Sequence, residues 1–173
     1  QHDLADYLVN ELKTMGVTNA FKDEFSYVYA TISGKVDKRI GLVAHLDTAL
    51  EITGADIKPQ IIEKYNGSDI KLNDKVHIKV QDYPFLEKCV NHKLVTTDGT
   101  TLLGADDKAG VAIIMTVIEK ILKLKGNHPT ILIAFTPDEE VGNGTLHFNY
   151  DYFKVDFAYT VDGGPINYIN YEN

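Results

Sequence analysis

The chain has 173 residues, 44% of them hydrophobic, which is enough to bury one substantial core, so a single domain is expected. Its 17 basic and 25 acidic residues give a net charge of −8, which argues against nucleic acid or an anionic membrane surface as the main partner. No run approaches the roughly 18 to 20 apolar residues of a membrane span. The single cysteine, Cys89, excludes a disulfide within the chain and favours a reducing, cytoplasmic compartment.

The first part of the chain predicts a helix followed by two strands. Apolar residues recur at helical spacing over residues 2–15, and Gly16 follows as a stop signal. Residues 25–33 alternate in the manner of a strand. Residues 39–44 form a short apolar run, which favours a central strand of a sheet.

The middle of the chain is less regular. Residues 53–91 are long and polar, and we expect an excursion from the core there with one or two short strands, such as residues 75–80. Residues 92–97 and 100–103 then predict a hairpin around an Asp-Gly turn.

The last part of the chain contains the strongest helix signal. Residues 108–125 carry one apolar face, and Gly126 ends the helix. Apolar runs predict buried strands at residues 130–135 and 157–161. This order of elements favours an α/β fold, a three-layer sandwich with a largely parallel central sheet.

An imidazole and a carboxylate follow the predicted central strand directly. His45 and Asp47 share a face if the chain stays extended, because residues two apart in a strand point the same way. A metal-bound imidazole usually has its second nitrogen held by a carboxylate or a carbonyl, and Asp47 could take that part. A surface histidine beside a solvated aspartate would give the same pattern.

Three further groups of acids stand at the end of a predicted strand or the start of a predicted helix. Asp106 or Asp107 could simply cap the helix that follows, or bridge two cations. Glu139 and Glu140 are adjacent, and two neighbouring carboxylates are favoured only in water or where a cation or a shared proton compensates them. Asp162 could be an ordinary turn aspartate.

Four such signals in succession indicate a site for two divalent cations, because ligand sites in open α/β sheets gather at the carboxyl ends of the strands. Two cations about 3.5 to 4 Å apart need a bridging carboxylate, terminal carboxylate and imidazole ligands, and a base for the bridging water. Zinc favours this mixture of nitrogen and oxygen donors, and cobalt or manganese could occupy the same site.

Four segments carry a family resemblance: AHLDT at residues 44–48, TTDGTTLLGADDKAG at 96–110, AFTPDEEVG at 134–142 and YTVDGG at 159–164. Together they resemble peptidase T, the bacterial tripeptide aminopeptidases of the two-zinc exopeptidase superfamily. The resemblance runs in order over most of the chain. The second and third segments are specific to peptidase T, whereas the His-x-Asp motif alone indicates only the wider superfamily.

The resemblance implies a two-zinc site and a role for each of its residues. The implied metal ligands are His45, Asp106, Glu140 and Asp162. Asp106 would bridge the two metals, Glu139 would be the general base, and Asp47 would orient His45. The resemblance also implies a cis peptide bond between Asp106 and Asp107.

One part of the family pattern is missing. The family uses a further histidine for the second metal, and no histidine of this chain matches its motif. Residues 1–173 are therefore expected to be the N-terminal portion of a zinc-exopeptidase-like catalytic domain, without its C-terminal part and without the lid or dimerisation domain, and inactive alone. The parent protein would cleave small peptides, and the resemblance implies a homodimer. The alternatives are a related two-zinc dipeptidase or N-acyl amino acid deacylase, and a non-catalytic α/β module that holds a structural cation.

Overall fold

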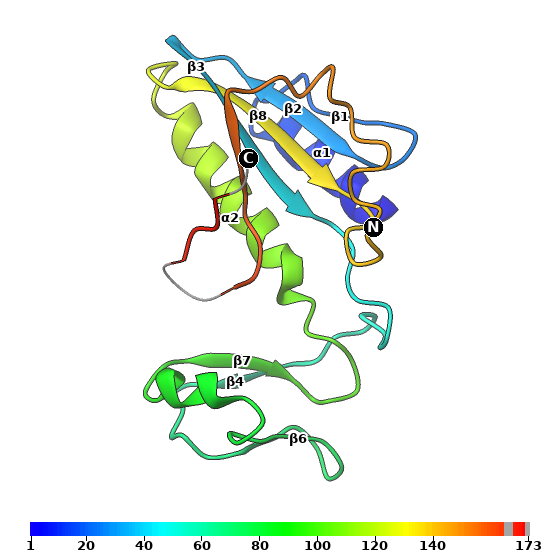
Figure 1. Ribbon diagram of the computed structural model, residues 1–173, viewed down its shortest axis with the longest axis vertical. Helices are drawn as coiled ribbons and strands as arrows, with labels where there is room; N and C mark the ends of the chain where they lie inside the picture. The colour runs from blue at the N-terminus through cyan, green and yellow to red at the C-terminus, as the bar shows by residue number, and fades with distance from the viewer. Residues whose placement is uncertain (165–167, 172–173) are drawn as a thin grey trace. The chain divides into compact units, whose positions relative to one another are not determined.

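A computed structural model describes residues 1–164 and 168–171 (Figure 1). The chain forms two compact units, where the composition predicts one domain: Gln1–Ala49 with Ala105–Asn173, and Leu50–Gly104. The strands of Leu50–Gly104 pair only with one another, so this segment builds small sheets of its own. Among the described residues, no helix is both long and apolar enough to cross a bilayer.

The larger unit contains a five-stranded sheet in the order β1-β2-β8-β3-β9. Its strands are β1 (Phe21–Lys22), β2 (Val28–Ile32), β3 (Val36–His45), β8 (Pro129–Thr136) and β9 (Phe157–Thr160). The strand β3 runs parallel to β8 and β9, and β2 runs antiparallel to β8. The α/β fold with a largely parallel sheet is therefore confirmed, with β3 in the interior of the sheet as predicted.

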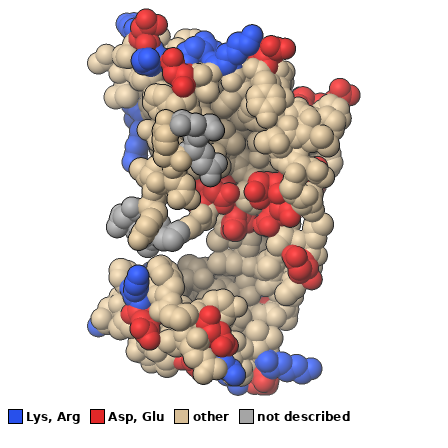
Figure 2. All heavy atoms as spheres, viewed as in Figure 1, with Lys and Arg blue, Asp and Glu red and all other residues tan. Residues whose placement is uncertain are grey.

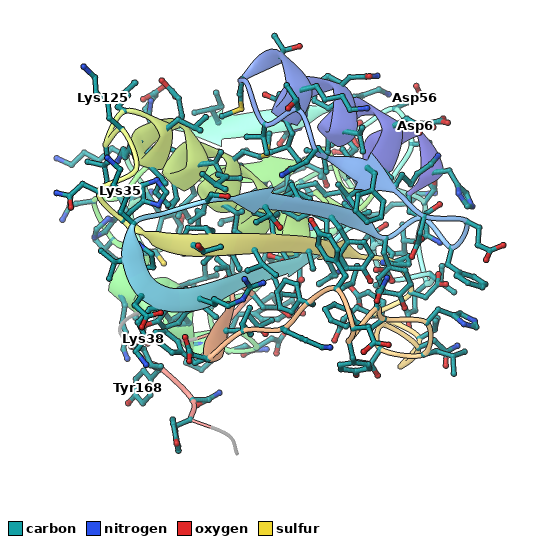
Figure 3. All side chains as sticks on the ribbon, turned by 90° about the horizontal axis from the view of Figure 1, so that it is seen from above. Asp6, Lys35, Lys38, Asp56, Lys125 and Tyr168 are labelled. Carbon is teal, nitrogen blue, oxygen red and sulfur yellow. The ribbon has the colours of Figure 1, made fainter. Side chains whose placement is uncertain are left out.

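The two helices of the larger unit lie on one face of the sheet (Figures 1 and 3). They are α1 (His2–Thr14) and α2 (Ala105–Leu122). Both bury the apolar stripe that the sequence predicts; the buried apolar residues are Ala5, Leu8, Val9, Leu12, Val111, Ile114, Met115 and Ile118. Asp106 and Asp107 have non-helical backbone angles, so regular helix begins at Lys108, where the sequence predicts it.

An irregular segment, residues 138–156, covers the opposite face and forms the third layer (Figure 3). Buried tyrosines of β2 and the residue before it hold this segment by their hydroxyl groups. The main-chain N–H of His147 donates to the Tyr27 hydroxyl at 3.3 Å, and that of Asn149 donates to the Tyr29 hydroxyl at 2.8 Å. The Tyr27 hydroxyl in turn donates to the Gly144 carbonyl at 3.1 Å. The sheet thus fixes a segment that has no helix or strand of its own.

A group of lysines lies at one end of this sheet, where Lys38 pairs with Asp156. Lys35, Lys38 and Lys125 lie together at the end where β3 starts (Figure 3). The other end, where β3 stops at His45, carries the candidate site residues. A cation site is therefore placed away from this group of lysines.

The strand β9 differs from its prediction. The sequence predicts a buried strand, but all four residues of β9 are exposed, with Phe157 44% and Tyr159 49% exposed. The reason is that β9 is the edge strand of the described sheet and pairs only with β3.

In the smaller unit, the predicted hairpin of residues 92–97 and 100–103 is wrong. This unit contains β4 (Pro59–Ile62), β5 (Ile70–Lys71), β6 (His77–Ile78), the 3-10 helix Pro84–Cys89 and β7 (Leu94–Thr97). The partner of β7 is β4, and residues 100–103 form no strand. The Asp98 carboxylate accepts hydrogen bonds from the N–H and the hydroxyl of Thr100, so the turn closes on itself instead of starting a second strand. A short strand predicted near residues 75–80 is present as β6.

Candidate metal centre

The register of the parallel strands brings the candidate residues together. His45 pairs with Thr136, so the residues that follow β8 lie beside the end of β3. On the other side, the N–H of Val161 donates to the Val43 carbonyl at 2.8 Å, which places the residue after it, Asp162, near His45. The carboxyl ends of three parallel strands therefore meet at one place, as the sequence predicts.

Three side chains form a possible metal triad at this place. The ligand atoms of His45, Asp106 and Asp162 all lie within 4.8 Å of one another. His45 Nε2 is 2.9 Å from Asp106 Oδ1 and 3.9 Å from Asp162 Oδ1. The imidazole of His45 is buried, whereas the side chains of Asp106 and Asp162 are partly open to solvent. One imidazole and two carboxylates are a donor set that suits zinc.

The acids around His45 change its pKa. Burial lowers the pKa of His45, but the hydrogen bond to Asp106 and the charges of Asp107, Asp47 and Asp162 outweigh it, so the net pKa is raised. His45 Nδ1 lies 3.4 Å from Asp47 Oδ1, in a geometry too poor for a hydrogen bond, and has no partner among the described groups. Since a divalent cation favours neutral imidazole, metal and proton compete for this ring.

Asp47 holds the backbone of both adjacent glutamates. Its Oδ1 accepts a hydrogen bond from the N–H of Glu139 at 3.1 Å, and its Oδ2 accepts one from the N–H of Glu140 at 3.0 Å. Glu139 Oε2 approaches His45 Nε2 to 3.8 Å. The Glu140 side chain is exposed and lies outside the triad. Asp47 therefore links the end of β3 to the start of the segment after β8.

Asp107 is a buried carboxylate on the inner side of the site. It is 2% exposed, and it accepts hydrogen bonds from the N–H of His45 at 3.1 Å and of Gly110 at 3.0 Å. The first bond fixes the end of β3, and the second caps the start of regular helix. Burial raises the pKa of Asp107 to about 6. The peptide bond between Asp106 and Asp107 is cis, as the resemblance implies.

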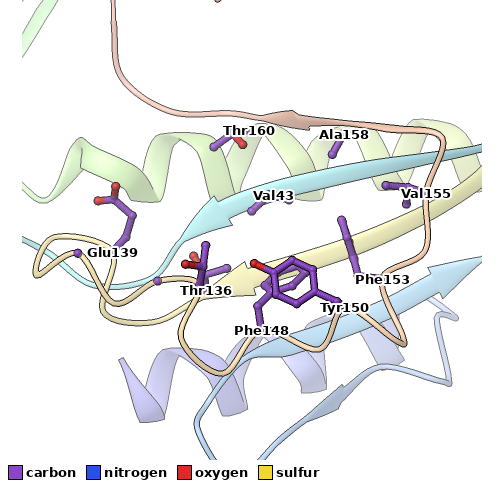
Figure 4. A pocket seen from close by; sticks show the side chains of 12 residues that line it. Val43, Thr136, Glu139, Phe148, Tyr150, Phe153, Val155, Ala158 and Thr160 are labelled. Atoms are coloured by element: carbon purple, nitrogen blue, oxygen red, sulfur yellow. The ribbon is translucent and has the colours of Figure 1, made fainter. Parts of the chain in front are cut away.

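Acidic side chains gather at this end of the larger unit (Figure 2). An apolar cavity of about 510 Å³ adjoins them on the face of the sheet covered by residues 138–156 (Figure 4). Glu139 lies on its wall together with Thr136, Val43, Phe148 and Phe153. A carboxylate close to the triad is therefore next to a space lined mainly by apolar side chains.

The sequence of this chain is similar to those of known peptidases. Residues 74–168, more than half of the chain, match the model of peptidase family M20/M25/M40. The chain belongs to this family. It is 50% identical to "Peptidase T" of Halothermothrix orenii and 50% identical to "Peptidase T" of Geobacillus thermodenitrificans, in each case over 100% of this chain and 44% of the relative. The chain thus spans less than half the length of these relatives.

Two solved structures have a similar fold. Aminopeptidase PepT from Bacillus cereus is 25% identical with a TM-score of 0.67, over 94% of this chain and 38% of that one. A tripeptidase from Staphylococcus aureus, 23% identical, shares the fold with a TM-score of 0.66, over 94% of this chain and 38% of that one. Peptidases of the M20/M25/M40 family are metal-dependent, in line with the triad at His45.

Two features of this M20/M25/M40 site are not predicted by the sequence. Asp47 is expected to orient His45, but its carboxylate also binds the backbone of Glu139 and Glu140. Asp107 is expected to be a cap or a bridge, and it also binds the N–H of His45. The order of residues in a motif gives no signal for such hydrogen bonds, because they depend on the register between strands.

We expect Asp47→Ala to weaken zinc binding by the chain about 10- to 100-fold, the range typical for residues that support metal ligands. The substitution removes the acceptor for two N–H groups and the carboxylate nearest to His45 Nδ1. Isothermal titration with zinc measures the affinity. Asp151→Ala is the matched control, because the Asp151 side chain is 98% exposed. Equal affinities in the two variants would rule out the supporting role of Asp47.

Proposed function

We propose that this chain is the N-terminal portion of the catalytic domain of a zinc-dependent aminopeptidase that removes the N-terminal residue from tripeptides. The observation that carries the proposal is the meeting of His45, Asp106 and Asp162 at the ends of the strands, in a chain half identical to proteins called peptidase T. The relatives are more than twice as long. The remaining ligand of a second zinc and the lid would belong to that additional length.

The donor set suits one zinc at His45, Asp106 and Asp162, and Asp106 with Glu140 would serve a second. A bound zinc pair supplies a Lewis acid for the peptide carbonyl and a nucleophilic hydroxide near neutral pH. Asp106 and Asp162 are open to solvent, so substrate can reach them.

The residues of the chain would do the remaining work. Glu139, on the wall of the apolar cavity, takes the proton of the attacking water and passes it to the leaving amine. Asp47 keeps the backbone of Glu139 and Glu140 in place. The free amino terminus of the peptide is attracted by the excess of carboxylates, and the cavity beside Glu139 offers room for a substrate side chain.

A chimaera tests this function. In it, the chain replaces the matching 44% of the Geobacillus thermodenitrificans protein. We expect the zinc-loaded chimaera to hydrolyse tripeptides faster than dipeptides or N-acyl amino acids, and the 173-residue chain alone to show little hydrolysis. Release of free amino acid, followed by chromatography, measures the rates. A chimaera that prefers dipeptides or N-acyl amino acids would point to the related hydrolases instead. Failure of the chain to bind zinc would contradict the proposal.

A further inference from the structure

Lys108, the residue at which regular helix begins in α2, contacts the end of β3 through its ammonium group. Its Nζ donates hydrogen bonds to the main-chain carbonyl of Leu46 at 3.1 Å and to that of Asp47 at 3.4 Å. Both carbonyls lie just beyond the last residue of β3. The half-buried Lys108 side chain thus supplies donors where the strand has ended.

Two consecutive residues of α2 therefore hold three consecutive residues at the end of β3, from its last residue, His45, to Asp47. The Asp107 carboxylate accepts from the N–H of His45, and the Lys108 ammonium donates to the two carbonyls that follow. The side chain of Asp47 continues this connection to the backbone of Glu139. The position of His45 and of the acids after β8 thus depends on the start of α2.

The charge of Lys108 makes this arrangement unusual for a cation site. Burial lowers the pKa of Lys108 and outweighs the opposing effect of the carboxylates of Asp47, Asp107, Asp106 and Glu140, which favour its charged form. In the described part of the chain, no lysine or arginine forms an ion pair with these acids, and the Lys108 ammonium bonds to main-chain carbonyls instead. By Coulomb's law alone, a positive charge near the triad opposes a bound cation. The contribution of Lys108 to metal binding must therefore come from its hydrogen bonds and not from its charge.

We propose that Lys108 is a positioning residue of the metal centre, which holds the turn after β3 so that His45 faces Asp106 and Asp162. This inference rests on the proposed metal-dependent function. Among the described residues, the hydrogen bonds of the Lys108 ammonium go to the carbonyls of residues 46 and 47 and not to a side chain of the triad, so Lys108 would act through these carbonyls.

Zinc titration of the 173-residue chain and its variants tests the inference. We expect Lys108→Met to weaken zinc binding about tenfold or more, in the range of residues that orient metal ligands. Lys108→Arg keeps a charged donor and should recover most of the affinity. Lys123→Met is the matched control, because Lys123 lies just after α2 and forms an exposed ion pair with Glu119. This variant should bind zinc as the parent does. The visible absorption of cobalt-loaded chain should change in Lys108→Met, because it reports coordination geometry.

The sign of the effect separates positioning from charge. Deletion of a positive charge alone would tighten zinc binding, so an unchanged or tighter affinity in folded Lys108→Met overturns the inference. Circular dichroism checks the fold. If Lys108→Met does not fold, Lys108→Gln, too short to reach both carbonyls, takes its place with the same expected weakening, and parental affinity there also overturns the inference. A parental chain that binds no zinc overturns the proposed function itself, and His45→Ala gives the reference for a lost site.

Discussion

Glu139→Gln is expected to lower tripeptide hydrolysis by the zinc-loaded chimaera about 100- to 10,000-fold, the usual contribution of a general acid or base. Glutamine has the same shape as glutamate but cannot accept the proton of the attacking water. The backbone N–H of residue 139 would still bind Asp47, so the position of the segment is retained. Zinc affinity should therefore stay close to that of the parent, while the turnover rate falls.

The neighbouring residue provides the control. Glu140→Gln removes a proposed metal ligand, so we expect weaker zinc binding and partial recovery of activity at high zinc concentration. Steady-state kinetics at two zinc concentrations, together with zinc titration, separate the two variants. Near-parental hydrolysis by Glu139→Gln at full zinc occupancy would exclude Glu139 as the base. Loss of zinc binding in that variant would instead indicate that Glu139 is the metal ligand and Glu140 the base.

Asp107 is expected to make the metal-free chain less stable as the pH rises from about 4 to about 6. Its pKa is raised by burial from 3.8 to about 6 in the folded chain, so folding favours the protonated form. The stabilisation is complete below the pKa of the unfolded chain and is lost as the pH rises through about 6. Since one pKa unit corresponds to about 1.4 kcal/mol, the contribution is about 3 kcal/mol.

Urea unfolding measures the free energy of unfolding of the metal-free chain. The measurement is repeated at several pH values from about 3.5 to about 7, a range that includes the folded and unfolded pKa of Asp107. Asp107→Asn cannot ionise, so the difference in stability between the parent and this variant should change by about 3 kcal/mol across the window. Other titrating groups contribute to both proteins and cancel in the difference. Two parallel curves would show that the pKa of Asp107 is the same in the folded and the unfolded chain.

The sequence predicted the elements whose pattern is local. Four such elements are present: the helices α1 and α2, predicted by their apolar stripes, and the strands β3 and β8, predicted by their apolar runs. The hairpin at residues 92–103 failed because the partner of β7 is β4, which lies much earlier in the chain, with Ile62 paired to Leu94 and Pro59 to Thr97. The exposure of β9 could not be predicted either, because an apolar run does not reveal how many neighbours a strand has.

The candidate site follows the same division. His45, Asp106 and Asp162 stand at the ends of strands and the start of a helix, and the parallel arrangement brings them together as the sequence predicts. Glu140, expected to hold the second metal, lies outside this triad, and its role stays a prediction. The partners of Asp107 and Lys108 depend on where β3 stops relative to α2, which no spacing in the sequence specifies.

The hydroxyl groups of Tyr27 and Tyr29 have a consequence for which residues these positions can accept. Phenylalanine would fill nearly the same volume in the aromatic core, so packing alone does not distinguish the two residue types. Unlike phenylalanine, however, tyrosine has a hydroxyl group that can accept hydrogen bonds from the N–H groups of His147 and Asn149. The hydrogen bonds of residues 138–156 thus require tyrosine at positions 27 and 29. The buried face of the sheet thereby helps to order the segment that carries Glu139, which would lie beside the substrate.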